Sequence, residues 1–417
     1  MPVFDYLGGN DTQLIKDALT LAKVYWGGNT DQNYQYSATD GWKILDKNIL
    51  NYDGKVNLHG AFYGEKALFR SAEANVMGKY DAEGHLVNIG INFWGTGADA
   101  SASSLEQKLN SWMDIGHDLA SAIPFANVAV NYVMNAYSHL MSSVADFARE
   151  NGLTGNDIIV SGHSLGGLAV NSMATLSAEG AWDGFFTDSK YIAFASPIQN
   201  QLNDNVLNIG YENDPVFRAL NGDAFTSETL FRHDTPRETA TNNIVNFNDY
   251  HGGMSAAGIL NPMSIVYLPS WLAHVGSEYA DGVSRIMNAD IYDLTHQDST
   301  IIVSNLSEPN RSKVWVEDLN QSNPHTGSTF IVGTETNDLL KGGSGNDYLY
   351  GGGGDDSFKD HSGYNVIYGG EGENTYITES KISDFSFSHD LFGNLYFKYS
   401  TGDITKAENI SYVNGLC

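Results

Sequence analysis

The sequence predicts an α/β protein built on a mostly parallel sheet and followed by a parallel β-roll. Short apolar segments alternate with segments of helical periodicity between residues 86 and 211, and a glycine-flanked turn joins one of these strands to a helix. From Gly333 onward the chain falls into units of nine residues. Strands that alternate with helices favour parallel pairing. A short glycine-rich repeat indicates stacked turns and strands.

The individual elements follow from the spacing of apolar residues. Strands are expected where apolar residues alternate or form short runs, at residues 86–93, 157–160, 191–195 and 206–211. Helices are expected where apolar residues recur every three or four positions, at residues 131–151 and from residue 165 to about residue 176.

The composition fits a folded chain with a large core. Of the 417 residues, 41% are hydrophobic and only 17% are charged, which excludes a chain that is disordered by composition. Lys and Arg number 22 against 50 Asp and Glu, so the net charge is −28. This charge argues against a nucleic-acid partner, because phosphate backbones bind clustered basic surfaces.

Cysteine usage and the N-terminus exclude further classes. Cys417 is the only cysteine, so neither an intrachain disulfide nor a cysteine-based zinc site is expected. Residues 1–6 lack the basic start and the apolar segment of a cleaved secretory signal. No run approaches the roughly 18 apolar residues of a membrane span, so no transmembrane segment is expected.

Residues 333–377 form five consecutive nine-residue repeats without an insertion. The second and third repeats, which begin at Gly342 and Gly351, match G-G-x-G-x-D-x-U-x at every fixed position. This is the repeat-in-toxin (RTX) nonapeptide pattern, which forms a parallel β-roll that binds Ca²⁺. A flexible glycine linker is the alternative, but a linker has no reason to keep a period of nine with an apolar residue at position eight.

The repeat predicts which side chains meet. The acid or amide at position six should face the same position two repeats later. Asp338 should therefore meet Asp356, Asp347 should meet Asn365, and Asp356 should meet Asn374. Carboxylate and carbonyl oxygens suit Ca²⁺. The apolar residues at position eight should stack between the two layers of the roll: Leu340, Leu349, Phe358, Ile367 and Tyr376.

A candidate nucleophile lies in the turn after the predicted strand at 157–160. Residues 162–166 read Gly-His-Ser-Leu-Gly, a G-x-S-x-G match followed directly by the predicted helix. A strand–turn–helix setting is the one in which a hydrolase presents its serine, here Ser164. The alternative is a glycine-rich turn whose serine only caps the helix.

A serine nucleophile needs a base and a residue that orients the base. Asp214 follows the predicted strand at 206–211 and is the candidate acid, with Glu212 as its competitor. His274 lies in an apolar segment where a neutral base is plausible. His251 is the runner-up, and spacing alone does not decide between the two histidines.

Long segments of the chain closely resemble the extracellular RTX-bearing bacterial lipases of subfamily I.3. The longest runs from Thr154 to Leu220 and contains Ser-Gly-His-Ser-Leu-Gly-Gly-Leu-Ala-Val-Asn-Ser-Met and Asn-Ile-Gly-Tyr-Glu-Asn-Asp-Pro-Val-Phe-Arg-Ala-Leu. The likeness covers most of residues 1–377 and includes residues 3–6, 64–66, 78–81, 301–319 and the repeats.

This resemblance implies an α/β-hydrolase fold and a serine esterase that acts on lipid esters. It assigns Ser164 as the nucleophile, Asp214 as the acid and His274 as the base, and so selects His274 over His251. The oxyanion hole would use the backbone N–H of Leu165 and, as its second donor, the backbone N–H of Thr96. The family usually has arginine where this chain has Trp94, next to that loop.

The resemblance also implies Ca²⁺ sites in the catalytic domain. One would use two carbonyls and three side chains: Arg237, Ala240, Asn242, Asn243 and Asp298. The family has aspartate in place of Asn242, and the lost charge should weaken this site. A second would use Asp114 and Asp118 with nearby residues, namely Ser71, Glu73 and Gly97. Its alternative is a solvated acidic helix face.

The expected domains are an α/β-hydrolase catalytic domain at residues 1–325, the β-roll at 333–377, and a β-rich C-terminal cap or export tail at 378–417. The segment at residues 26–55 is short and polar, whereas the relatives carry a long apolar lid at this place. Residues 120–137 are either a remaining lid or an ordinary packed helix.

The expected function is that of a secreted Ca²⁺-dependent lipase, which hydrolyses triacylglycerol esters at a lipid–water interface. Export would need no cleaved signal and would use a type I (ABC) exporter as partner. The shortened lid leaves phospholipase A1 or short-chain carboxylesterase activity as alternatives. A non-catalytic Ca²⁺-binding RTX surface protein or adhesin is the alternative from another class.

Overall fold

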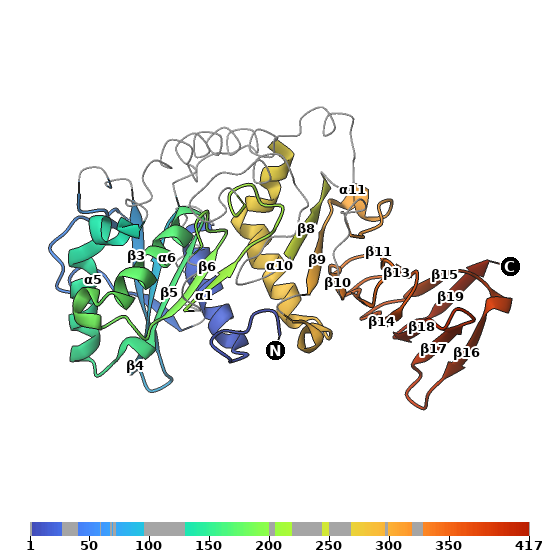
Figure 1. Cartoon of the computed structure of the whole chain (residues 1–417). Helices are drawn as coiled ribbons and strands as arrows, with labels where there is room; N and C mark the ends of the chain where they lie inside the picture. The colour runs from blue at the N-terminus through green and yellow to red at the C-terminus, as the bar shows by residue number, and fades with distance from the viewer. Residues whose placement is uncertain are drawn as a thin grey trace.

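The computed structural model describes residues 2–26, 41–58, 60–66, 69, 72–95, 130–199, 205–218, 244–249, 268–296, 299–318 and 328–416. Within these residues the chain is an α/β-hydrolase domain that continues into a parallel β-roll, as predicted (Figure 1). No helix among them is both long and apolar enough to cross a bilayer.

The first sheet is parallel where the site lies and antiparallel at its edge. Its strand order is β1-β3-β4-β5-β6-β7, with β2 paired to β3. The strands are β1 (Trp42–Ile44), β2 (Phe62–Tyr63), β3 (Glu73–Tyr80), β4 (Leu86–Phe93), β5 (Ile158–His163), β6 (Lys190–Phe194) and β7 (Val206–Ile209). Strands β4 to β7 pair in parallel. The strand predicted at 86–93 is confirmed at both ends.

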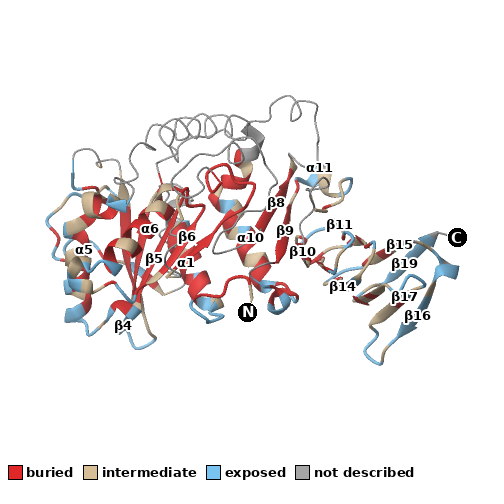
Figure 2. Ribbon diagram, in the orientation of Figure 1, coloured by how far each residue is buried: buried red, intermediate tan, exposed pale blue. Residues whose placement is uncertain are grey.

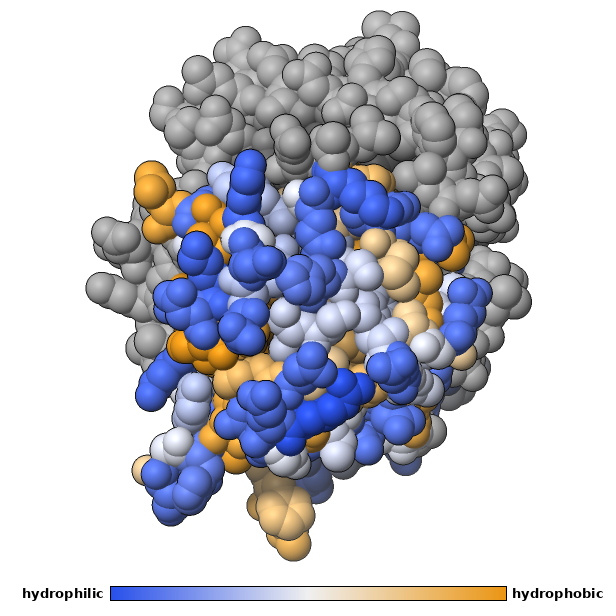
Figure 3. All heavy atoms as spheres, turned by 90° about the vertical axis from the view of Figure 1, so that its left-hand side faces the viewer, coloured by the Kyte–Doolittle hydropathy of each residue, from blue (hydrophilic) through white to orange (hydrophobic). Residues whose placement is uncertain are grey.

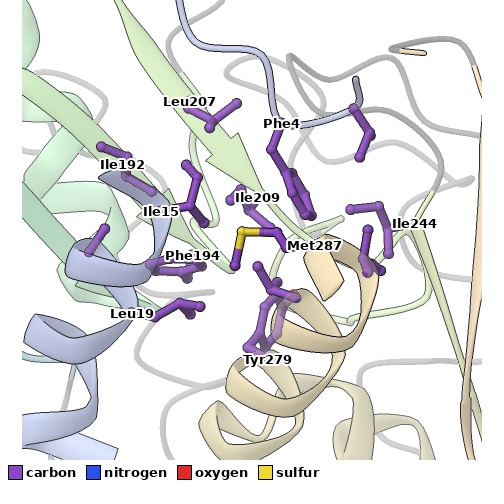
Figure 4. Packing of buried hydrophobic residues seen from close by; sticks show 14 of the residues in the cluster. Phe4, Ile15, Leu19, Ile192, Phe194, Leu207, Ile209, Ile244, Tyr279 and Met287 are labelled. Atoms are coloured by element: carbon purple, nitrogen blue, oxygen red, sulfur yellow. The ribbon is translucent and has the colours of Figure 1, made fainter. Parts of the chain in front are cut away.

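Helices cover both faces of this sheet. They are α1 (Thr12–Trp26) and α10 (Gly276–Asn288) on one face, with α5 (Tyr132–Glu150) and α6 (Leu165–Ala178) on the other. Successive strand residues point to opposite faces. Ile159 therefore packs with α1 and α10, while Ile158 and Val160 pack with α5 and α6. Figure 2 shows the buried strands between the helices, and Figure 4 shows the core next to α10.

Helix α5 is amphipathic and breaks once. Asp146 and Arg149 form an ion pair on its exposed face, and hydrophilic residues predominate on the described part of this side (Figure 3). The helix leaves helical geometry at Tyr137, where φ is −142°. Val133 and Tyr137 are buried, so from Tyr132 onward the segment at 120–137 is a packed helix. Its residues 120–129 lie outside the described part of the chain, as do residues 27–40 of the other lid segment.

The second sheet runs from the hydrolase domain into the roll. Its order is β16-β17-β18-β14-β12-β10-β9-β8. These strands are β8 (Ile244–Asn248), β9 (Thr300–Asn305), β10 (Thr329–Val332), β12 (Asp347–Tyr350), β14 (Tyr364–Tyr368), β16 (Phe385–His389), β17 (Leu395–Tyr399) and β18 (Ile404–Glu408). The pairing of β9 with β10 crosses the expected domain boundary near residue 325. One ladder therefore joins the two units.

The opposite layer of the roll is a four-stranded sheet. It contains β11 (Leu339–Lys341), β13 (Ser357–Lys359), β15 (Thr375–Lys381) and β19 (Tyr412–Leu416). Strands two repeats apart pair in parallel, for example Leu340 with Phe358. The five apolar residues predicted to stack between the layers are all fully buried: Leu340, Leu349, Phe358, Ile367 and Tyr376.

The remaining regular elements of the described residues are short. They are α11 (Glu308–Arg311) and the 3₁₀ helices η3 (Gly155–Asp157), η4 (Ala181–Gly184), η6 (Leu268–His274), η7 (Tyr292–Leu294) and η8 (Ile382–Asp384).

Candidate active site

Ser164 occupies a strained turn between β5 and α6. Its φ of 60° and ψ of −124° lie in a region of backbone conformation that residues other than glycine rarely adopt. The turn is tight, since a Cβ at Gly166 would lie 2.1 Å from the carbonyl oxygen of Phe93. This geometry holds the serine hydroxyl beyond the end of the parallel strands, as a nucleophile elbow does.

Three residues from distant parts of the chain meet at this turn. Ser164 Oγ lies 3.0 Å from His274 Nε2. His274 Nδ1 lies 2.9 Å from Asp214 Oδ2 and 3.1 Å from Oδ1. All three side chains are buried, with Asp214 fully inaccessible to solvent. The structure thus brings together the predicted nucleophile, base and acid, and it places Asp214 rather than the competing Glu212 against the imidazole.

The Asp214 carboxylate is fixed by two further donors. The Val216 N–H donates to Oδ1 at 2.8 Å, and the Tyr279 hydroxyl donates to Oδ2 at 2.7 Å. The same hydroxyl accepts the Tyr211 N–H at 3.0 Å. Burial raises the pKa of Tyr279 well above its usual value, and the Asp214 charge raises it further, so the hydroxyl stays protonated. Nothing in the sequence pattern singled out Tyr279.

Aromatic rings enclose the imidazole of His274. The His163 ring lies 4.9 Å away at 30°, and the Trp271 ring lies 5.8 Å away at 90°. His163 also packs edge-on against Tyr279 at 5.4 Å. Burial lowers the pKa of His163 well below its usual value, and the neighbouring His274 contributes to the shift. The base therefore lies against a ring that stays neutral.

The roll turns bring the predicted pairs of position-six residues together. The Asp338 N–H donates to Asp356 Oδ1 at 2.7 Å, and the Asp356 N–H donates to Asn374 Oδ1 at 2.9 Å. In the other stack of turns, the Asp347 N–H donates to Asn365 Oδ1 at 3.0 Å. The predicted register of two repeats is therefore confirmed.

These turns fit a calcium ion by their chemistry. Asp356 Oδ2 is buried and finds no hydrogen-bond partner among the described residues. Burial raises the pKa of Asp356 to about 8, with the Asp338 charge adding to the shift, and burial raises the pKa of Asp347 to about 6. A bound cation would offset the free-energy cost of burying the charged carboxylates of Asp356 and Asp347.

Backbone oxygens would complete such a site. Within the described residues no three acidic, histidine or cysteine side chains converge on one point, so turn carbonyls must supply part of the oxygen set. The turns stack closely enough for this. A Cβ at Gly352, where φ is +94°, would lie 2.2 Å from the carbonyl oxygen of Thr334.

Comparisons with known proteins agree with both parts of the fold. A family model described as RTX calcium-binding nonapeptide repeat (4 copies) matches residues 326–358 and 359–380. A lipase of Pseudomonas fluorescens is 48% identical over 296 residues, which are 71% of this chain and 60% of that protein. Another lipase of the same organism is 45% identical over 331 residues, which are 79% of this chain and 70% of that protein. The crystal structure of extracellular lipase LipA from Serratia marcescens matches with a TM-score of 0.90 at 40% identity, over 100% of this chain and 74% of that one.

The chain belongs to the RTX-bearing extracellular bacterial lipases. Members of this family are carboxylic ester hydrolases. The chain spans 60% of the length of one P. fluorescens relative and 70% of the other.

One half of the oxyanion hole expected for this lipase family is described. Leu165 is the first residue of α6, so its N–H has no partner within the helix and is free to face a developing oxyanion. Thr96, the second expected donor, lies outside the described residues. Two positions earlier in the chain, the Trp94 N–H donates to the Glu73 carbonyl at 2.9 Å, and the Trp94 indole N–H donates to Asn75 Oδ1.

The calcium sites expected in the lipase catalytic domain fall mostly outside the described residues. All five residues of the first site do so: Arg237, Ala240, Asn242, Asn243 and Asp298. Of the second set only Glu73 is described, and its Oε1 accepts the side-chain amide of Asn57 at 3.3 Å. The others lie outside: Asp114, Asp118, Ser71 and Gly97.

The lowered pKa of His163 predicts a stability loss at acid pH. Below pH 6.5, the usual pKa of a histidine, the unfolded chain binds a proton at His163 that the folded chain does not bind. The free energy of unfolding should therefore fall by up to about 1.4 kcal/mol per pH unit through this group as the pH drops from 6.5 towards 5. Denaturant unfolding of the wild type and His163→Gln at each pH measures the difference. His85→Gln, at an exposed histidine, is the control. Parallel curves for the wild type and His163→Gln would contradict the assignment.

Removing the hydroxyl that holds the acid should slow catalysis. Tyr279→Phe leaves the Asp214 carboxylate without one donor, and a hydrogen bond to a charged group contributes about 1.5–3 kcal/mol. We expect kcat on a soluble ester to fall about 10- to 100-fold at little changed KM. Tyr211→Phe is the matched control, because its hydroxyl donates to the Glu278 carbonyl instead. Equal kcat values for the two variants would show that Tyr279 has no special role.

Proposed function

We propose that the chain is a secreted, Ca²⁺-dependent lipase that hydrolyses triacylglycerol esters through a Ser164–His274–Asp214 triad. The observation that carries this proposal is the 3.0 Å contact between Ser164 Oγ and His274 Nε2, with Nδ1 of the same ring on the Asp214 carboxylate. Only the neutral imidazole with its proton on Nδ1 can accept the serine proton at Nε2, and Asp214 favours that tautomer.

The reaction follows from these contacts. Ser164 Oγ attacks the ester carbonyl while His274 Nε2 takes its proton, and the Leu165 N–H stabilises the oxyanion. His274 then returns the proton to the leaving alcohol, and an acyl-enzyme remains on Ser164. Water then enters, and its oxygen attacks the acyl carbon while His274 Nε2 takes its proton. The bond between the acyl carbon and Ser164 Oγ breaks, His274 returns the proton to Ser164 Oγ, and the fatty acid leaves. Asp214 stabilises the imidazolium at both stages.

Calcium would act on the fold of the roll. Bound Ca²⁺ supplies positive charge between stacked carboxylates. At an affinity near 10⁻⁴ M, millimolar Ca²⁺ outside the cell stabilises each site by about 1.4 kcal/mol, whereas cytosolic levels contribute almost nothing. This difference suits a chain that crosses an ABC exporter unfolded and folds outside.

The substrate class is tested by comparing initial rates on emulsified triolein, phosphatidylcholine vesicles and p-nitrophenyl butyrate, with Ca²⁺ and with a chelator. We expect the highest rate on triolein and a large loss after chelation. A fluorophosphonate probe should label the peptide that contains Ser164. A preference for phosphatidylcholine or for the short ester would overturn the triacylglycerol assignment, and labelling elsewhere would overturn the nucleophile.

A further inference from the structure

Helix α10 contacts both the catalytic acid and the roll. It begins at Gly276, just after His274, and its Tyr279 donates to Asp214. Further along the helix, Arg285 donates a hydrogen bond to Gly333, the first residue of the first repeat of the roll. A single rigid helix thus links the triad to the start of the calcium-binding repeats.

The Arg285 guanidinium makes directional contacts with both units. Nη1 donates to the Gly333 carbonyl at 2.5 Å, and Nη2 donates to the Ser304 carbonyl at 2.9 Å and to Asn305 Oδ1. Nε donates to Asp281 Oδ2 at 2.8 Å on the same helix. The side chain is only 11% exposed, so these contacts are poorly screened by solvent.

Ser304 connects the same arginine to the first position-six aspartate. Its hydroxyl donates to Asp338 Oδ1 at 2.9 Å. Asp338 Oδ2 accepts the Thr334 N–H at 2.6 Å, which closes the first turn of the roll. The Asp338 N–H in turn binds Asp356, the residue with the unpaired carboxylate oxygen. Continuous hydrogen bonds therefore run from Asp356 to Arg285.

We propose that Arg285 is a positioning residue that couples calcium loading of the roll to the catalytic acid. Ordering of the first turn, residues 333–338, would restrain α10 through Gly333 and Ser304. The restrained helix would hold the Tyr279 hydroxyl on Asp214. This contact tolerates little displacement, because O–H···O hydrogen bonds span only about 2.5–3.0 Å and weaken steeply when the donor angle falls below about 120°. This coupling rests on the proposed function, since it concerns the rate of the proposed triad.

The coupling is distinct from a stabilising contact. If Arg285 only stabilised the fold, replacing it would lower the unfolding temperature and leave the response of α10 to Ca²⁺ unchanged. A coupling arginine controls that response, and this difference can be measured in the folded full-length chain.

Amide hydrogen–deuterium exchange provides the first readout, on the full chain with millimolar Ca²⁺ and with a chelator. In the wild type, Ca²⁺ should slow exchange in peptides from α10 (residues 276–288) as well as in the roll. In Arg285→Gln, it should slow exchange in the roll only. Arg285→Lys, which keeps the charge but not the fork of donors, should restore part of the effect. Asp281→Asn, at the exposed end of the ion pair, should behave like the wild type.

Steady-state kinetics on p-nitrophenyl butyrate provides the second readout. The ratio of kcat with Ca²⁺ to kcat without it should fall at least about fivefold in Arg285→Gln, with KM unchanged. Arg149→Gln, at an arginine on α5 that pairs with Asp146, is the matched control and should keep the wild-type ratio.

Two results would overturn the coupling. One is Ca²⁺-dependent protection of α10 in Arg285→Gln equal to that in the wild type. The other is an unchanged kcat ratio in that variant. Failure of the proposed function is separate, because it would appear as wild-type turnover that survives Ser164→Ala. If the wild type hydrolyses ester through Ser164 but the protection of α10 by Ca²⁺ does not depend on Arg285, the coupling alone is wrong.

Discussion

Replacing Ser164 with alanine is expected to lower kcat on a soluble ester about 10⁶-fold. In the proposed mechanism the Ser164 hydroxyl is the group of the triad that bonds to the acyl carbon, so its loss would remove the covalent route. The oxyanion donor and the bound geometry remain, and they should leave a residual rate about 10³–10⁴-fold above the uncatalysed reaction. Stopped assays with p-nitrophenyl butyrate at high enzyme concentration reach this range.

The control for Ser164→Ala is Ser161→Ala in β5, the strand that ends just before Ser164. Ser161 is also buried, but its hydroxyl donates to the Ala18 carbonyl at 2.8 Å, away from the imidazole. The Ser161→Ala substitution should reduce the free energy of unfolding by about 1 kcal/mol and leave kcat unchanged. If Ser164→Ala retained more than about a tenth of the wild-type kcat, the acyl-enzyme mechanism would be wrong, because Ser164 supplies the hydroxyl that contacts His274 Nε2.

The roll shows where sequence reasoning works well. A period of nine fixes the register, so the contact of Asp338 with Asp356 could be predicted without coordinates. The same holds for the buried stack that includes Leu340 and Phe358. Such repeats have few other ways to pair because glycine turns and apolar positions must coincide in every layer.

Contacts between remote segments were not predictable in this way. Tyr279 and Arg285 lie on one amphipathic helix whose apolar spacing predicts burial but not the partner of a hydroxyl or guanidinium. Their partners come from the segment after β7, from β9 and from the first repeat, and only the folded topology brings these together. The joining of β9 to β10 escaped prediction for the same reason, since a change in composition near residue 325 does not report strand pairing.

Replacing Asp214 with asparagine should have the second-largest effect, a fall in kcat of about 10⁴-fold. The argument starts from the donors around the carboxylate. The Val216 N–H points at Oδ1 and cannot turn away, whereas the Tyr279 hydroxyl at Oδ2 can rotate. The asparagine oxygen should therefore take the Oδ1 position, and the amide nitrogen should take the Oδ2 position, beside His274 Nδ1.

An amide N–H in that place donates to His274 Nδ1 and shifts the ring proton to Nε2. A protonated Nε2 cannot accept the proton of Ser164, so the geometry survives while the base is lost. Kinetics and the unfolding temperature of Asp214→Asn, compared with Glu212→Gln, separate the two acids. A large loss of kcat in Glu212→Gln together with near-normal turnover in Asp214→Asn would move the acid to Glu212. The opposite result, with both variants folded, is expected because Asp214, and not Glu212, lies within 3.1 Å of His274 Nδ1.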